Sequence, residues 1–207
     1  MVLYGSGGHA KVVLESLVSC GESVEGIFDD RLSGVSFKEI EVLGVYDPEK
    51  LLDHPLIVTI GNNEIRRKIS LQVTHPFGTV IDRRALLSPQ SQIGEGSVVM
   101  ASCIIQPDTQ IGKHVIINTG AVVEHDCRVA DYVHIGPRAV LCGLVEVGEG
   151  TLVGANAVVA PLVKIGKWCQ ISAGSSVLED VPDYSVVMGV PGKIVKVIEP
   201  NSVTNVS

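Results

Sequence analysis

Aliphatic residues recur with a period of six along about half of the chain. From Ile81 to Val177, every sixth residue is isoleucine, valine or leucine, without exception. A period of six matches neither an amphipathic helix nor a half-buried strand, whose periods are about 3.6 and 2. It is typical of a parallel β-helix, in which each hexapeptide supplies a short strand and a corner. Three hexapeptides make one triangular coil, so residues three hexapeptides apart stack on adjacent coils at about the 4.8 Å strand spacing.

A second column of small residues supports this register. The residue four positions after each aliphatic is never larger than valine, as expected where a large side chain would overpack the core. Cys103, Cys127 and Cys169 fall in this column, and we interpret them as core residues rather than catalytic thiols. Cys20 is expected at a helix end, and the role of Cys142 stays open.

The first 78 residues follow a different pattern, in which short buried strands alternate with helices. Strands are expected at residues 2–4, 24–28 and 56–60, and helices at residues 10–18, 47–52 and 64–73. This β-α-β-α-β-α order predicts a small parallel sheet of Rossmann type. The predicted domains are a Rossmann-like domain over residues 1–78, a β-helix over 79–185, a loop and strand over 186–199 and a flexible tail over 200–207.

The first strand leads into a glycine-rich turn. Gly5, Gly7 and Ala10 form a variant of the dinucleotide fingerprint, and Asp29-Asp30 stand at the ribose-binding distance. Glycines let backbone N–H groups approach a phosphate at a helix N-terminus, but a tight strand-to-helix turn needs the same residues. The unit is too short for a full dinucleotide fold, so a nucleotide monophosphate or nucleotide-sugar fits better than NAD. We expect the loops at 5–9, 29–30 and 61–63 at the carboxyl edge of the sheet.

One corner column of the predicted β-helix is interrupted by a histidine. Followed once per coil, this column reads Pro89, Pro107, His125, Gly143 and Pro161. A titratable side chain beside a residue without a side chain leaves room for a ligand, and the glycine N–H can face a developing oxyanion. Asp126 can orient or polarise His125. The competing interpretation is an ordinary surface histidine in a loop.

The remaining β-helix histidines give weaker signals. His134 lies half a coil after His125, so it can join that site only across a subunit interface, and His114 stands at a turn without an evident partner. The spacings of 11 and 9 residues between His114, His125 and His134 offer no compact chelate, so we expect no metal.

Composition narrows the partners and the compartment. The net charge is −7, and no basic run exists, which argues against nucleic acid and acidic membrane surfaces. No apolar run reaches the ~20 residues of a membrane span, and the N-terminus lacks signal-peptide features. Five cysteines without a CxxC pair favour a reduced cytoplasmic protein.

Five motifs narrow the interpretation to a family. They are YGSGGHA at 4–10, FDD at 28–30, IGNNEIR at 60–66, INTGAVVEHD at 117–126 and MGVPGK at 188–193. With them the chain resembles the left-handed β-helix acyltransferases of the hexapeptide family, over residues 1 to about 197. Within that family it resembles the nucleotide-amino-sugar N-acetyltransferases of bacterial glycan synthesis, and it is also similar to the sialic acid O-acetyltransferases.

The resemblance implies a homotrimer with acetyl-CoA, the co-substrate, in clefts between neighbouring β-helices. It implies His125 as general base, Asp126 as the acid that raises its basicity, and Asn118 near the reacting groups. The residues implied to contact acetyl-CoA are His134, Gly143, Gly154, Ala155 and Ala173. Those implied to hold the nucleotide-sugar are Gly7, Gly8, His9, Asp29, Asp30 and Gly61.

The expected reaction is transfer of an acetyl group to an amine, at C4 of a UDP-4-amino-sugar or of GDP-perosamine. O-acetylation of a sialic acid or another sugar hydroxyl is the alternative that uses the same machinery. A non-catalytic nucleotide-sugar-binding trimer and a metal-dependent hydratase on the same scaffold also stay open.

Overall fold

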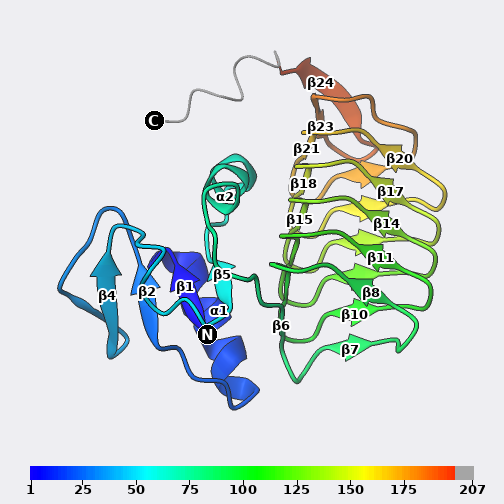
Figure 1. Cartoon of the computed structure of the whole chain (residues 1–207). Coiled ribbons are helices and arrows are strands. Elements are labelled where there is room, and N and C mark those ends of the chain that lie inside the picture. The colour runs from blue at the N-terminus through cyan, green and yellow to red at the C-terminus, as the bar shows by residue number, and fades with distance from the viewer. Residues whose placement is uncertain (199–207) are drawn as a thin grey trace.

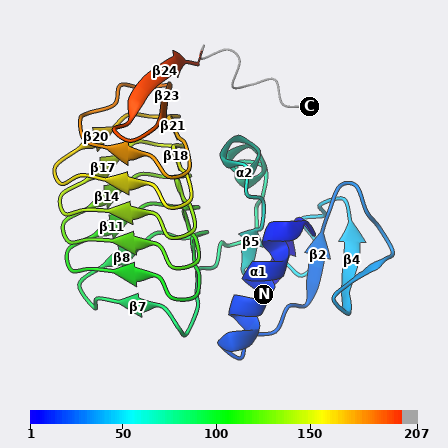
Figure 2. The same cartoon turned by 180° about the vertical axis from the view of Figure 1, so that it is seen from behind.

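The computed structural model describes residues 1–198 and contains an α/β unit beside a stack of triangular coils (Figures 1 and 2). The elements of the α/β unit are β1 (Val2–Tyr4), α1 (Gly8–Ser19), β2 (Gly26–Phe28), β3 (Ser36–Phe37), β4 (Ile40–Gly44), β5 (Leu56–Val58) and α2 (Asn63–Ser70). Its sheet has the order β3-β4-β2-β1-β5, in which only β3 runs antiparallel to its neighbour. The predicted Rossmann-like sheet is therefore confirmed.

The segment between β2 and β5 differs from the prediction. The sequence predicts a helix over residues 47–52, but the structure has turns there, and the antiparallel pair β3-β4 precedes them. Asp47 caps a turn by accepting a hydrogen bond from the Glu49 N–H at 3.0 Å. Leu51 then adopts a left-handed backbone with φ 55°, so the turn cannot continue as a right-handed helix.

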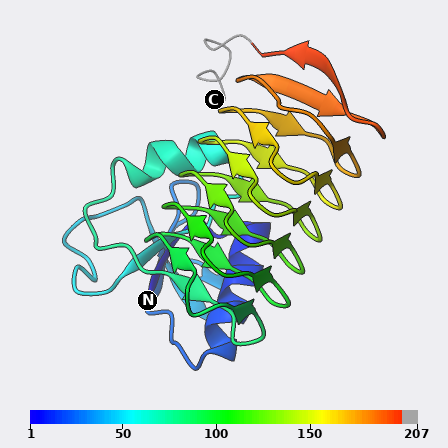
Figure 3. The same ribbon diagram turned by 90° about the vertical axis from the view of Figure 1, so that its right-hand side faces the viewer.

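The β-helix consists of two-residue strands, each ending on a residue of the sixfold column, and these strands stack into three flat faces (Figure 3). The covered face, which packs against the α/β unit, holds β6 (Val80–Ile81), β9 (Val98–Val99), β12 (Ile116–Ile117), β15 (His134–Ile135), β18 (Leu152–Val153) and β21 (Gln170–Ile171). The apolar face holds β7 (Leu86–Leu87), β10 (Ile104–Ile105), β13 (Val122–Val123), β16 (Val140–Leu141), β19 (Val158–Val159) and β22 (Ser176–Val177). The charged face holds β8 (Gln92–Ile93), β11 (Gln110–Ile111), β14 (Arg128–Val129), β17 (Glu146–Val147) and β20 (Lys164–Ile165).

Strands on each face pair in parallel with the strand three hexapeptides further along the chain, as the repeat predicts. A terminal hairpin, β23 (Ser185–Met188) and β24 (Lys193–Val197), continues the covered face after the last coil. The sequence predicts a loop and one strand over residues 186–199, whereas the structure has two strands joined by a turn up to Val197. The tail predicted over residues 200–207 lies outside the described residues.

Three cysteines belong to the core of the coils. Cys103, Cys127 and Cys169 are buried, which confirms their interpretation as core residues. Burial raises the pKa of Cys103 and of Cys127 to about 11. Their thiols donate to backbone carbonyls, that of Cys127 to Cys142 O at 3.2 Å. A thiol that is neutral and enclosed in this way is a poor nucleophile.

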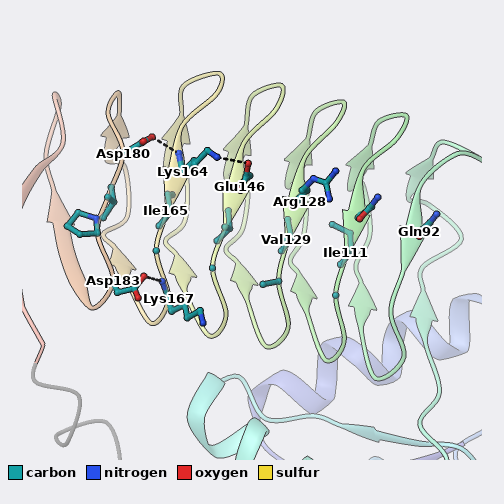
Figure 4. A pocket seen from close by; sticks show the side chains of 18 residues that line it. Gln92, Ile111, Arg128, Val129, Glu146, Lys164, Ile165, Lys167, Asp180 and Asp183 are labelled. Carbon is teal, nitrogen blue, oxygen red and sulfur yellow. Dashed lines mark hydrogen bonds and ion pairs between the residues drawn. The ribbon is translucent and has the colours of Figure 1, made fainter.

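The two faces that lie away from the α/β unit differ in chemistry. The outward residues of the charged face are Gln92, Gln110, Arg128, Glu146 and Lys164, with an ion pair of 3.0 Å between the last two (Figure 4). A shallow groove of about 860 Å³ follows this face. The outward residues of the apolar face are Leu86, Ile104, Val122, Val140 and Val158, followed by Ser176 on the last strand; Leu86 is 67% and Val158 is 42% exposed. Such a continuous apolar stripe is typical of a surface that a partner covers.

Neither helix in residues 1–198 is long and apolar enough to cross a bilayer.

The inner column gives a stability prediction. Cys127 stacks between Thr109 and Val145, so Cys127→Val replaces it with a residue of the same shape as its neighbours. We expect this variant to lose less than about 1.5 kcal/mol of unfolding free energy, and Cys127→Leu to lose about 1–3 kcal/mol through overpacking. Chemical denaturation of both variants measures the difference. Equal stability of the two would contradict the tight inner position.

Candidate functional site

The carboxyl edge of the α/β sheet carries the glycine-rich turn. Gly5 has φ 104°, and α1 begins at Gly8 directly after the turn. A Cβ added at Gly7 or Gly8 would meet no atom within 4 Å, so their backbone faces open space. Asp29 accepts hydrogen bonds from the backbone N–H and the hydroxyl of Ser6, at 2.9 and 2.6 Å. The Asp29 carboxylate therefore holds the turn in shape.

Asp30 stands beside an aromatic group at the same edge. The Tyr4 hydroxyl donates to both of its carboxylate oxygens, at 2.9 and 3.0 Å. Burial, and then the nearby Asp30 carboxylate, raise the pKa of Tyr4. The Tyr4 ring stacks on Tyr46 with a centroid distance of 5.9 Å. Asp30 is thus a fixed hydrogen-bond acceptor at the edge where open α/β sheets bind ligands.

A polar cluster lies where the α/β unit meets the covered face. The Asn118 amide nitrogen is 3.1 Å from His134 Nε2, and the His134 ring lies 6.4 Å from that of His9. Burial lowers the pKa of His9 to about 3 and that of His134 to about 4, so both rings are neutral near pH 7. The amide then donates and His134 Nε2 accepts. His9 Nε2 is buried and has no partner within residues 1–198.

His125 occupies the edge between the apolar and charged faces, after β13. Its Nδ1 lies 2.8 Å from a carboxylate oxygen of Asp126, which fixes the ring and leaves Nε2 available. A Cβ at Gly143 would lie 2.6 Å from His125 Cε1 and Nε2, so the ring rests directly on this glycine. Within residues 1–198 the Gly143 N–H has no hydrogen-bond acceptor. A base and a free donor therefore lie side by side, one coil apart.

The opposite edge of the apolar face holds Asn118 and three of the residues predicted to contact acetyl-CoA. Asn118 and Gly154 occupy one column of the corner between the covered and apolar faces, and Ala155 and Ala173 occupy the next. Gly154 itself has no room for a side chain, since a Cβ there would lie 2.6 Å from the Ala173 nitrogen.

The predicted residues thus divide between two edges of one face. His125, Asp126 and Gly143 lie at one edge, whereas Asn118 lies at the other, where it touches His134. The expected neighbourhood of Asn118 and the reacting groups is not formed within a single chain. His134 likewise stands away from His125, as the half-coil offset predicts.

Sequence reasoning missed the residues that join the two parts of the molecule. Arg66 and Asn63 of α2 donate to backbone carbonyls of the coils, and Arg67 pairs with Glu149 at 3.1 Å. A cleft of about 280 Å³ beside this junction is lined by residues 61–64, Leu152 and Trp168, among others. The only signal in the sequence was the IGNNEIR motif, which contains both donors.

Residues 1–198 contain no group of three or more histidine, cysteine or acidic side chains placed to share an ion. His114 instead stacks on Tyr132 with a centroid distance of 5.3 Å and meets the edge of Phe77.

Family models match both parts of the chain. Residues 1–73 match the PglD N-terminal domain, and residues 90–125 and 108–143 match the six-repeat bacterial transferase hexapeptide model. An uncharacterized protein of Acanthamoeba polyphaga mimivirus, L142, is 36% identical over 94 residues, which make up 44% of this chain and 19% of that protein. The chain therefore spans about a fifth of the length of this relative.

Two solved structures match nearly the whole chain. A histidine-to-asparagine variant of perosamine N-acetyltransferase from Caulobacter crescentus, in complex with CoA and GDP-perosamine, is 40% identical with a TM-score of 0.89, over 93% of this chain and 95% of that one. The acetyltransferase domain of PglB from Neisseria gonorrhoeae, in complex with acetyl coenzyme A, is 33% identical with a TM-score of 0.87, over 94% and 98%. At these identities and coverages, the chain belongs to the hexapeptide-repeat acetyltransferase family with a PglD N-terminal domain.

Proposed function

We propose that this protein transfers the acetyl group of acetyl-CoA to the amine, at C4, of a nucleotide-linked amino-sugar. The observation that carries this proposal is the His125–Asp126 pair resting on Gly143, whose N–H has no hydrogen-bond acceptor within residues 1–198. The relative that binds CoA and GDP-perosamine supports the substrate class. In this proposal residues 1–78 hold the nucleotide-sugar, and residues 79–185 carry out the transfer in the cytoplasm.

The proposed reaction is a direct transfer. The amine attacks the thioester carbonyl while His125 Nε2 takes its proton, and Asp126 stabilises the resulting imidazolium through Nδ1. The Gly143 N–H donates to the tetrahedral oxyanion. The C–N bond forms, the C–S bond breaks, and the thiolate of CoA leaves with the proton from His125. No acyl-enzyme is needed, in keeping with the buried thiols of the core.

We further propose that the apolar faces of three copies surround a threefold axis. A cyclic interface is heterologous, so one edge of each apolar face meets the opposite edge of the next copy. His125 of one subunit then approaches Asn118 and His134 of its neighbour, which a single chain keeps apart. In this arrangement acetyl-CoA lies in the cleft between two β-helices, against Gly143 of one copy and the corner of Gly154 of the other.

The His125 imidazole is the proposed base, and its removal tests the mechanism. We expect His125→Ala to lower kcat by about 10²–10⁴-fold, since proton removal loses its catalyst, with unfolding unchanged because the side chain is exposed. Release of CoA thiol in the presence of nucleotide-linked 4-amino-sugars measures the rate. Pro89→Ala, in the same column two coils away, is the matched control and keeps its rate.

A near-normal rate for His125→Ala would overturn the assignment. Thiol release with sialic acid but not with a 4-amino-sugar would favour the O-acetyltransferase alternative. If none of the sugars causes thiol release, a non-catalytic binding protein would be favoured.

The Gly143→Ala variant tests the contact between this glycine and the His125 ring. Its backbone angles suit any residue, so Gly143→Ala should fold normally while its methyl group pushes the His125 ring aside. Displacement of a catalytic group by about 1 Å can cost about 100-fold, and we expect a fall in kcat of that order. Thermal unfolding and steady-state kinetics separate the two effects, and an unchanged kcat would contradict the contact.

Sites shared between subunits can be tested by mixing variants. His125→Ala and Asn118→Ala are each expected to be inactive alone, whereas co-expression in equal amounts should restore about a quarter of wild-type activity, because a quarter of the interfaces then lack both changes. Activity that stays at the level of the single variants would show that each chain holds a complete site.

The proposed trimer can be tested by placing a charge on the apolar face. Val140→Lys places a charge on the apolar face and should yield monomers in analytical ultracentrifugation, whereas Gln110→Lys on the charged face should not.

A further inference from the structure

Arg66 is a fully buried cation whose hydrogen-bond acceptors are all uncharged. Only 1% of the residue is exposed, and within residues 1–198 no carboxylate lies in ion-pair distance of its guanidinium. All five of its N–H donors are nevertheless used, by His114 O at 2.9 Å, Tyr132 O at 2.8 Å, Ile60 O at 3.0 Å, Gly61 O at 3.3 Å and Asn63 Oδ1 at 2.9 Å. A buried charge is costly, and these hydrogen bonds offset the lost hydration.

The coils present these carbonyls because of how they turn. His114 and Tyr132 occupy the same corner of adjacent coils in the left-handed conformation, with φ 53° and 60°. In this corner the preceding residue, such as Lys113, provides the carbonyl that bonds the next coil, so the corner carbonyls themselves stay free of the ladder. Asn63 extends the contact by donating to Gly150 O at 3.0 Å, one coil further on. Helix α2 thus binds three successive coils.

The same guanidinium also fixes a loop of the candidate site. Its contacts with Ile60 and Gly61 hold the segment after β5, where the nucleotide-sugar is proposed to bind. Its contact with Tyr132 is made two residues before His134. One side chain therefore sets the position of the substrate loop relative to His134 and Asn118.

We propose that Arg66 is a positioning residue for acetyl transfer, which places the loop at 60–63 against the His134–Asn118 pair and the neighbouring His9 ring. The proposal rests on the proposed function. Arg66 is not proposed to contact the amine or the thioester. It acts through the loop and through the rings of His9 and His134. A lysine supplies only three donors on a flexible stem and cannot reproduce the five-bond fork.

The charge of Arg66 acts on every histidine around it. Burial is the main cause of the low pKa of His9, His134 and His114, and Arg66 lowers each of them further. The other groups facing this set are Tyr132 against Arg66, the Gly61 carbonyl against His134, and Glu95, Asp131 and Lys113 around His114. Removing the charge should therefore raise the pKa of His134 from about 4 toward the ordinary value of 6.5.

Two substitutions separate geometry from charge. Arg66→Lys keeps the charge but loses the fork, so kcat/KM for the nucleotide-sugar should fall about 10–100-fold while His134 titrates as in the wild type. Arg66→Gln loses both, so the same fall should be joined by titration of His134 at higher pH. Lys68→Gln, at an exposed position of the same helix, is the matched control and should keep wild-type kinetics.

Histidine ring NMR on the full chain gives a measurement independent of turnover. His134 of Arg66→Gln should titrate at higher pH than in the wild type, whether or not any amino-sugar is acetylated, so failure of the proposed function leaves this test intact. Wild-type kinetics in Arg66→Lys, or an unmoved His134 titration in Arg66→Gln, would overturn the proposal. If Arg66→Gln does not fold, the kinetics of Arg66→Lys decide, because loss of stability alone lowers the melting temperature without changing KM.

Discussion

Closure of the chain into a triangular coil after every third hexapeptide is the constraint on which the rest of the structure depends. Each coil bonds to the next along three faces, and the inner corners accept only small side chains such as Cys127 and Val145. Once a coil is closed, every outward residue belongs to a fixed column, and its neighbours in space lie one full coil away along the sequence. The contact between His125 and Gly143 follows from this arithmetic and needs no special loop.

The prism also explains why the candidate site is divided. A flat face has two edges, and the structure places the base at one and the Asn118–His134 pair at the other. The side chains between them, among them Val122 and Val140, are apolar, whereas the charged face carries glutamine, arginine and lysine. The apolar face separates the two halves of the site within one chain. Because its exposed side chains are apolar, it is also the face that a second copy is most expected to cover.

Sequence periodicity predicted the coils, the core cysteines and the His125 corner, because each is a property of columns with a strict period. It did not predict features that lack the usual residues for their structure. The β3-β4 hairpin turns through Lys38 and Glu39 in the left-handed region, where asparagine and glycine are the usual signal. Arg66 was also missed, because an arginine in a polar helix is normally exposed, and only the tertiary structure reveals carbonyls that replace water around it.

Because α2 is docked on particular coils, the number of coils between its contacts is fixed. Arg66 and Asn63 bind the corners at His114, Tyr132 and Gly150, and His125 lies within that same span. A whole coil added after Val177 would lengthen the prism and leave these anchoring contacts and the candidate site unchanged. A coil inserted between His114 and Tyr132 would preserve every strand pairing, yet it would separate two anchoring carbonyls by a further strand spacing of about 4.8 Å. Repeat number is therefore free to vary at the end of the stack and fixed in the middle.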